Sequence, residues 1–299
     1  MIRLYFLQAF YHLRENPIIT WVSILGTAMA ICMIMVLVIT FQVRLVDCEP
    51  EVNRSRTLYV PYMSVKQKGN SDNESANASM SVRTGRECFR ALSMPEAVTL
   101  ASGVYRVRAS VPSRSKATAD MVQTDEAFWT IFSFHFLSGE AFTKADCDAG
   151  LTRAVLDATT ARRLFGTTDA VGRTVQLDYV DYTVAGVVAD VSMLATAAYA
   201  QIWVPYTAAG AEAMSWQNDT MGPMHAIILA RSSADFDAIR EETELLRKKY
   251  NDGLQDVEVF YRGQPDTQLA YLYRRWYAEP DVPGVMLRYA IVVIILLLV

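Results

Sequence analysis

The residues best suited to metal or thiol chemistry are four cysteines and three histidines, and they are scattered along the chain. They are Cys32, Cys48, Cys88 and Cys147, with His12, His135 and His225. Cysteine and histidine ligands of a metal ion usually come in close pairs such as CxxC, and no such pair is present, so we predict no metal site. Cys32 lies in an apolar run, which leaves an odd number of thiols outside it. Pairing of Cys48 with Cys88 is one option that the sequence does not decide.

The sequence also lacks the common motifs of catalysis and nucleotide binding. It has no GxxxxGK[ST] loop for phosphates, no GxSxG and no HExxH. Asp146 and Asp148 lie close together, but such acidic pairs are more often solvated loop residues than a general acid and base. We therefore predict no catalytic residue, no cofactor and no enzymatic activity.

Charge argues against nucleic acid as a partner. Between Arg44 and Leu287 the chain has 25 basic and 31 acidic residues, a net charge of about −6. A protein that binds nucleic acid needs a basic face to neutralise phosphates.

The run Ile18–Phe41 is predicted to be a transmembrane helix. It contains no charged residue, and about 20 helical residues suffice to cross a hydrocarbon core of about 30 Å. A cleavable signal peptide has a shorter apolar stretch and ends in small residues, whereas this run ends in Ile39, Phe41 and Val43. A buried helix of a soluble domain is the alternative, but such helices seldom lack a polar stripe over this length.

The sequences at the two ends predict further membrane contacts. Residues 1–17 have the pattern of an amphipathic helix at the cytoplasmic interface, although a plain extension of the span would look similar. Residues 288–299 are almost wholly apolar and predict the start of a second transmembrane helix, cut within the span. Basic residues before the first span predict weakly that the N-terminus is cytoplasmic. The lipid bilayer is thus a predicted partner, and residues 44–287 form an extracytoplasmic domain.

Periodicity and turn signals predict an α+β domain of two lobes between these helices. The outer lobe is expected at about 52–112 and 222–262, and the inner lobe at about 113–221. The expected strands are 57–60, 104–111, 154–156, 174–177, 182–188, 201–205, 225–230 and 257–261. The expected helices are 93–100, 159–165, 235–250 and 268–278, and 66–81 is expected to be a loop.

Several ordered motifs resemble those of one family, the MacB/FtsX-type ABC transporter permeases. Phe6–Phe41, with SILG at 23–26, is similar to the family's first transmembrane segment, and Asp125–Asp146 to its aromatic-ended helix followed by GxxFT. TARRLFG at 160–166 and AVGRTV at 170–175 resemble A-x-x-L-F-G and P-V-G-K, with Ala170 in place of the usual proline. YTVAGVVAD at 182–190 and IWVP at 202–205 complete the resemblance. From the residues alone, Gly139, Gly166, Gly172 and Gly186 are expected at turns or helix ends.

The resemblance implies a permease subunit in a bacterial inner membrane, with its main domain in the periplasm. It implies four transmembrane helices, a dimer with a second copy or a paralogue, and a separate ABC ATPase subunit. A periplasmic adaptor protein is a further implied partner. In this family, ATP-driven closure of the cytoplasmic subunits moves the extracytoplasmic domains, so the expected function is export or extraction of lipoproteins, peptides or hydrophobic compounds.

Two other classes of protein share this topology. A membrane-anchored sensor of the receptor-kinase type also places an extracytoplasmic domain between two spans, and a structural or adhesion protein could be anchored at both ends. Two further spans beyond Val299 favour the permease, whereas a coiled-coil linker into a kinase or cyclase favours the sensor. The substrate and the residues that contact the ATPase are not predictable from these residues.

Overall fold

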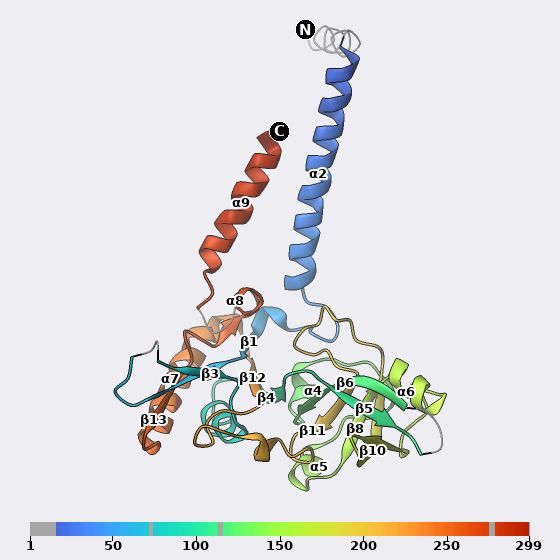
Figure 1. Cartoon of the computed structure of the whole chain (residues 1–299), viewed down its shortest axis with the longest axis vertical. Coiled ribbons are helices and arrows are strands. Elements are labelled where there is room, and N and C mark those ends of the chain that lie inside the picture. The colour runs from blue at the N-terminus through green and yellow to red at the C-terminus, as the bar shows by residue number, and fades with distance from the viewer. Residues whose placement is uncertain (1–15, 72–73, 113–115, 275–278, 299) are drawn as a thin grey trace. The chain divides into compact units, whose positions relative to one another are not determined.

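The computed structural model describes residues 16–71, 74–112, 116–274 and 279–298, which fall into two units (Figure 1). The helical unit comprises residues 1–45 and 281–299, and the α+β unit comprises residues 46–280. The predicted interfacial helix at 1–17 lies almost wholly outside the described residues.

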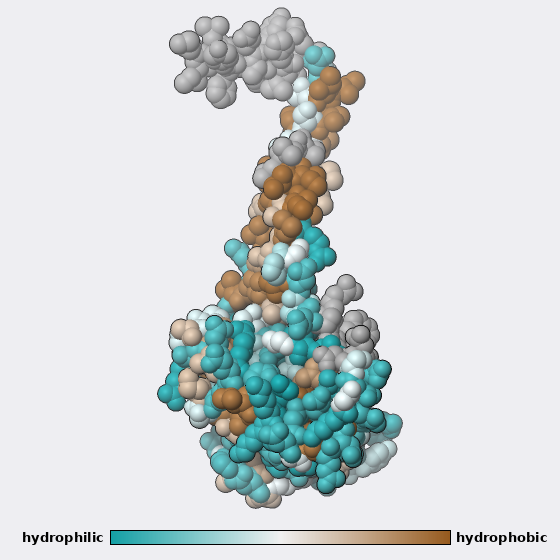
Figure 2. All heavy atoms as spheres, turned by 90° about the vertical axis from the view of Figure 1, so that its left-hand side faces the viewer, coloured by the Kyte–Doolittle hydropathy of each residue, from teal (hydrophilic) through white to brown (hydrophobic). Residues whose placement is uncertain are grey.

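Helix α2 (Pro17–Leu45) confirms the predicted apolar helix and extends beyond it. It has 29 residues, of which Ala30 is buried, and most of its large apolar side chains are exposed. Figure 2 shows the hydrophobic surface of the helices and the largely hydrophilic surface of the α+β unit. Among the described residues, α2 is the one helix long and apolar enough to span a membrane.

Helix α9 (Val282–Leu298) begins six residues before the start predicted at 288. The carboxylate of Asp281 accepts a hydrogen bond from the Gly284 amide at 3.0 Å, which caps the first turn. Pro283 is tolerated in this turn because no helical bond is required of its nitrogen. Within the helical unit, the rings of Phe41 and Tyr289 meet edge to face, with centroids 6.2 Å apart.

The α+β unit contains a four-stranded and a three-stranded antiparallel sheet. The first has the order β14, β1, β12, β4, with bounds Asp266–Thr267, Thr57–Val60, Met224–Leu229 and Ala97–Ser102. The second has the order β13 (Val257–Phe260), β2 (Met63–Gln67), β3 (Ala76–Ala78). Helix α7 (Phe236–Gly253) contributes Ile239 and Tyr250 to the apolar core that these sheets share.

The third sheet has seven strands and closes on itself. Its order is β7 (Phe136–Gly139), β10 (Val180–Val188), β8 (Arg153–Asp157), β11 (Ile202–Pro205), β6 (Lys116–Thr124), β5 (Tyr105–Ser110), β9 (Thr174–Leu177). Because β9 pairs with both β5 and β10, six of the strands form a ring, and β7 is paired with β10 outside it. Helix α6 (Ala158–Phe165) packs Leu164 and Phe165 into its core and ends at Gly166, whose φ of 77° is left-handed, as predicted.

The short elements that connect the strands are helices of three to six residues. They are η1 (Arg54–Arg56), α3 (Val82–Gly85), η2 (Arg86–Arg90), α4 (Phe128–Ile131), α5 (Lys144–Asp148), η3 (Ala211–Met214), η4 (Ser233–Asp235) and α8 (Gln268–Tyr273). Helix α8 confirms the first part of the predicted aromatic helix at 268–278, of which residues 275–278 lie outside the described part.

An aromatic cluster joins the third sheet to the first. Trp203 of β11 is fully buried, and its ring centroid lies 5.2 Å from that of Phe134 and 6.2 Å from that of Trp129. The same cluster includes Tyr59 and Ile227 of the first sheet. The aromatic residues of the motif at 125–146 therefore form a core between two sheets.

The predicted helix at 93–100 is wrong, because this segment contains strand β4. All six residues of β4 pair with β12, from Ala97 opposite Leu229 to Ser102 opposite Met224. Ser93 does not cap a helix: its hydroxyl donates to the Glu242 carboxylate of α7 at 2.7 Å. Pairing with a distant strand thus overrides the local capping signal.

Two further expectations need correction for the same reason. The predicted loop at 66–81 contains β3, which pairs with residues 63–65 of β2, and the end of β2, which pairs with β13. Strand β5 falls in the expected outer lobe (52–112), yet it is hydrogen bonded to β6 and β9 of the third sheet.

Gly139 and Gly186 face each other across β7 and β10, where the backbones approach too closely for a side chain. A Cβ on Gly139 would lie 2.2 Å from the Ala185 carbonyl oxygen, and one on Gly186 would lie 2.6 Å from that of Glu140. Gly139 and Gly172 have positive φ angles of 66° and 76°, but Gly186 is needed for space within a strand and not for a turn.

We expect Gly186→Ala to lower the free energy of unfolding by about 1–3 kcal/mol or more, because its methyl group overlaps backbone atoms that cannot move aside. Urea unfolding of the purified protein in detergent, followed by tryptophan fluorescence, measures the change. Gly253→Ala is the matched control, since nothing lies within 4 Å of its Cβ position. Equal stability of the two variants would contradict the prediction.

Candidate functional site: two buried arginine anchors

Arg54 is buried just after the point where the chain enters the α+β unit from α2. Its side chain is fully buried, and its Nε donates to Glu51 Oε2 at 2.7 Å. Nη1 donates to the carbonyl oxygen of Val46 at 2.8 Å, and Nη2 to that of Leu194 at 3.0 Å. One guanidinium therefore binds the first residue after α2 and a segment almost 150 residues away.

Glu51 extends this connection with its second carboxylate oxygen. Oε1 accepts hydrogen bonds from the amides of Ala197 and Ala198 at 2.8 and 3.0 Å. Arg54 and Glu51 therefore hold the segment 189–201 between β10 and β11, the first at Leu194 and the second at Ala197 and Ala198. We call Glu51 and Arg54 the N-terminal anchor.

Arg274 has the equivalent position where the chain leaves the unit towards α9. Its Nη2 donates to Asp266 Oδ1 at 2.7 Å and to the Arg262 carbonyl oxygen at 3.1 Å, and its Nε contacts Asp266 Oδ2. Burial raises the pKa of Asp266, and the adjacent Arg274 opposes that rise. We call Asp266 and Arg274 the C-terminal anchor; it fixes the end of α8 to β14.

A stacked pair of tyrosines links the segments that carry the two anchors. Tyr59 of β1 and Tyr271 of α8 have ring centroids 4.5 Å apart and nearly parallel planes. Burial raises the pKa of Tyr271 to about 12, and that of Tyr59 lies well above its usual value for the same reason. The Tyr59 hydroxyl has no hydrogen-bond partner among the described residues.

The stacked rings border a cavity of about 200 Å³ between the first sheet and the segment 189–201. His225 of β12 lies in its wall, partly exposed, with Nε2 at 2.8 Å from the Ser79 hydroxyl. Burial lowers the pKa of His225 to about 4, so the ring is neutral at pH 7.

A second buried carboxylate, Asp125, connects the first and third sheets. It accepts a hydrogen bond from the Thr99 hydroxyl at 2.6 Å and one from the Leu100 amide at 3.1 Å, both on β4. Burial raises the pKa of Asp125 to about 6, and Arg90, 3.6 Å away, opposes the rise.

The described residues that were considered for chemistry in the sequence do not come together, and His12 lies outside the described part of the chain. Asp146 belongs to the capping box of α5, and Asp148 pairs with Lys144 on the surface. Within the described ranges, no group of three His, Cys, Asp or Glu side chains could hold a metal ion.

All four cysteines are free, so the pairing of Cys48 with Cys88 is not formed. Cys88 and Cys147 are buried, which raises the pKa of each thiol to about 12, and Cys48 is exposed. Cys48 is therefore the readily accessible thiol of the α+β unit, and Cys32 is exposed on α2.

Sequence analysis did not single out either anchor. A lone arginine a few residues after a span has no distinctive spacing, and its partners at 194–198 are main-chain groups. The ion pair Glu51–Arg54 is an i, i+3 pair, but such pairs are common on protein surfaces.

Comparison with known proteins identifies the fold. The family model for the MacB-like periplasmic core domain matches residues 20–246. The extracellular domain of the noncanonical ABC-type transporter YknZ from Gram-positive bacteria is 16% identical, with a TM-score of 0.46; the match covers 67% of this chain and 99% of that one. The periplasmic region of MacB from Actinobacillus actinomycetemcomitans is 17% identical, with a TM-score of 0.47, and the match covers 68% and 90%. No curated protein sequence matches this chain.

These features define a membrane-anchored protein with an α+β domain of periplasmic type. The chain belongs to the family of MacB-like periplasmic core domains, and the assignment rests on the family match. This confirms the resemblance to the MacB/FtsX-type ABC transporter permeases.

We expect Glu51→Gln to lower the free energy of unfolding by about 3–5 kcal/mol, because it leaves the Arg54 guanidinium buried without a counter-charge. Glu87→Gln is the control, since Glu87 and Arg83 form a half-exposed pair whose loss costs about 1 kcal/mol at most. Urea unfolding followed by tryptophan fluorescence compares the two. A similar small effect of both substitutions would show that the N-terminal anchor contributes little to stability.

We expect the stability contributed by His225 to fall as the pH is lowered from about 6.5 to about 4. In this interval the unfolded chain binds a proton at His225, whereas the folded protein, with its lowered pKa, does not. The difference in unfolding free energy between wild type and His225→Gln should therefore shrink by about 3 kcal/mol at most between pH 7 and pH 4.

Comparing wild type with His225→Gln at each pH removes the contributions of the other titrating groups to the unfolding free energy. Asp125 acts in the opposite direction, because its raised pKa makes the folded protein bind a proton first as the pH falls. This contribution is common to both proteins and cancels. A difference that is constant with pH would contradict the lowered pKa of His225.

Proposed function

We propose that this protein is the permease subunit of an ABC transporter in a bacterial inner membrane. In this proposal its N-terminus is cytoplasmic, its α+β unit is periplasmic, and it couples a separate ATPase to motion of that unit. The proposed transport activity is export or extraction of lipoproteins, peptides or hydrophobic compounds. A second copy or a paralogue completes the transporter, and a periplasmic adaptor is a further partner.

The observation that carries this proposal is the pair of arginine anchors. A transporter that transmits force through its helices needs the chain to be fixed where it enters and leaves the moving domain. Arg54 binds the backbone of the first residue after α2. Arg274, at the end of α8, binds the Asp266 carboxylate and the Arg262 carbonyl oxygen. Both are buried ion pairs, which are costly to break.

The contacts between the first and third sheets favour a rigid α+β unit over a flexible one. The aromatic cluster around Trp203 and the hydrogen bonds of Asp125 both connect the first sheet to the third. A domain fixed in this way responds to displacement of its ends as one body, which is the kind of movement seen in rigid-body switching.

A membrane-anchored sensor is the second candidate. The observation in its favour is the cavity of about 200 Å³ beside Tyr59 and His225, which could admit a small ligand. A sensor of this kind has no ATPase partner, so the same experiment separates the two functions.

The test is purification of the tagged full-length protein from native membranes under mild conditions. We expect an ABC ATPase to co-purify and its hydrolysis to be faster in the complex than alone. A label on Val180→Cys, in a background without Cys32 and Cys48, should report an ATP-dependent change in the α+β unit.

Arg54→Lys tests the role of the N-terminal anchor. The lysine keeps the charge but cannot make all three directed hydrogen bonds of the guanidinium. We expect the ATPase to remain bound and active while the ATP-dependent change at residue 180 decreases. Arg83→Lys, on the surface, is the control. Absence of a co-purifying ATPase would argue for the sensor.

A further inference from the structure

Three large apolar side chains are exposed beside the N-terminal anchor. Met193 is 73% exposed, Leu194 is 50% exposed, and Val46 is 59% exposed. Together they form what we call the apolar rim. Side chains of this kind scattered singly need no explanation, but these three lie at one place.

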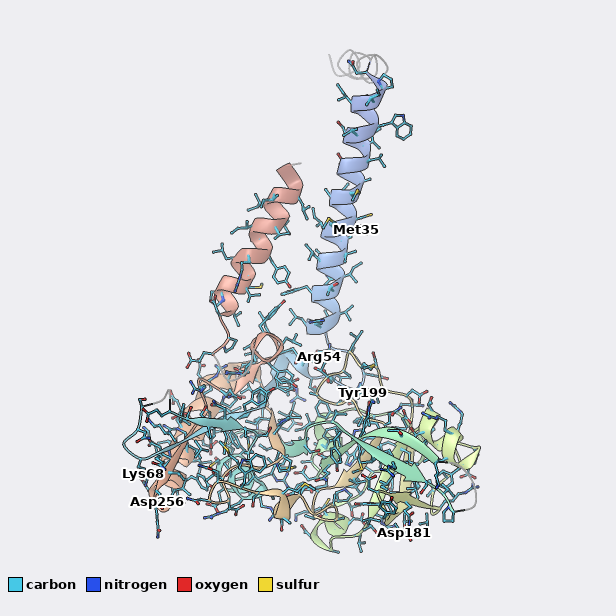
Figure 3. All side chains as sticks on the ribbon, viewed as in Figure 1. Met35, Arg54, Lys68, Asp181, Tyr199 and Asp256 are labelled. Carbon is cyan, nitrogen blue, oxygen red and sulfur yellow. The ribbon has the colours of Figure 1, made fainter. Side chains whose placement is uncertain are left out.

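The hydrogen bonds of Arg54 bring the members of the apolar rim together. Its Nη1 and Nη2 donate to the carbonyl oxygens of Val46 and Leu194, so these two residues lie on either side of one guanidinium. Figure 3 shows Arg54 and Tyr199 near one edge of the α+β unit and Asp181 at the opposite edge.

The backbone that presents Met193 and Leu194 is held firmly. The Leu194 amide donates to the Ser192 hydroxyl at 3.2 Å, and the Ala195 amide to the Ser192 carbonyl oxygen at 2.9 Å. Ala195 and Ala198 are buried, and Glu51 binds the amide of Ala198. The two large side chains therefore point away from a fixed turn, and their exposure is built into it.

Chain continuity places the apolar rim close to the end of the membrane span. Val46 directly follows Leu45, the last residue of α2. If the hydrocarbon core begins near Trp21, about 20 helical residues cross its 30 Å and it ends near Phe41. Val46 is then about 7 Å beyond that boundary along the helix, within the headgroup layer.

We propose that the apolar rim inserts into the boundary between headgroups and acyl chains in the leaflet where α2 leaves the membrane. The partner is the lipid bilayer itself. The contact is apolar and not electrostatic, because the charged residues nearest Val46 in the chain outside the anchor are Arg44, Asp47 and Glu49, which together carry no net positive charge to attract anionic headgroups. It rests on the membrane anchoring of the chain and holds whether the protein is a transporter or a sensor.

The test places an environment-sensitive fluorophore on the rim of the full chain. Met193→Cys, in a Cys32→Ser/Cys48→Ser background, is labelled with NBD and reconstituted into phosphatidylcholine nanodiscs. Cys88 and Cys147 remain, because they are buried thiols of raised pKa. We expect emission at shorter wavelength than for the controls, and loss of intensity when doxyl-labelled phosphatidylcholine is included.

Two exposed apolar residues away from the rim serve as matched controls. Leu245 on α7 is 66% exposed, and Val180, next to Asp181 at the opposite edge, is 47% exposed. Labels at these sites should emit as in water and should not be quenched by doxyl lipid. Adding phosphatidylglycerol should leave quenching at residue 193 unchanged, as the apolar contact requires.

Each other outcome would overturn the proposal. Quenching at residue 193 no greater than at residues 180 and 245 would show that the rim stays in water. A blue-shifted signal without quenching by doxyl lipid would show that protein, such as a second copy, covers it. Quenching at residue 193 that depends strongly on phosphatidylglycerol would show that the contact is electrostatic.

Discussion

The α+β unit buries the guanidinium of Arg54, and its N–H donors require hydrogen-bond partners. The guanidinium of Arg54 carries five N–H donors, and burying it without partners would be prohibitively costly. Its partners include one carboxylate and the backbone carbonyls of Val46 and Leu194. Those partners come from the start of the unit and from the segment between β10 and β11. Satisfying one charge therefore joins the first residue of the α+β unit to the segment between β10 and β11.

The same solution occurs at the other end of the unit. Arg274 binds Asp266 and the carbonyl of Arg262, which fixes the end of α8 to β14. Between the anchors, Tyr59 stacks on Tyr271, so the first sheet contacts both ends of the unit. A buried ion pair of this kind adds less stability than its Coulomb energy suggests, but its loss is severe. Such pairs suit a protein in which the chain ends must not detach.

The junction of the sheets combines apolar packing with groups that titrate near neutral or mildly acidic pH. The aromatic residues around Trp203 supply the packing, whereas Asp125 and His225 are enclosed there with pKa values of about 6 and about 4. The two shifts have one cause, because burial disfavours the charged form of each group. Their effects on stability oppose each other as the pH falls.

The sequence by itself determined the features that depend on local pattern. The uncharged run at 18–41 fixed a membrane helix, and the sequence from Thr160 to Gly166 predicted α6 with its left-handed end. Only the tertiary structure decided what depends on distant partners. Strand β4 replaced the helix expected at Ser93 because β12 offered six paired residues, and β5 joined the third sheet. The anchors were not predictable from local pattern either. Arg54, for example, binds main-chain carbonyl oxygens, which have no sequence signature.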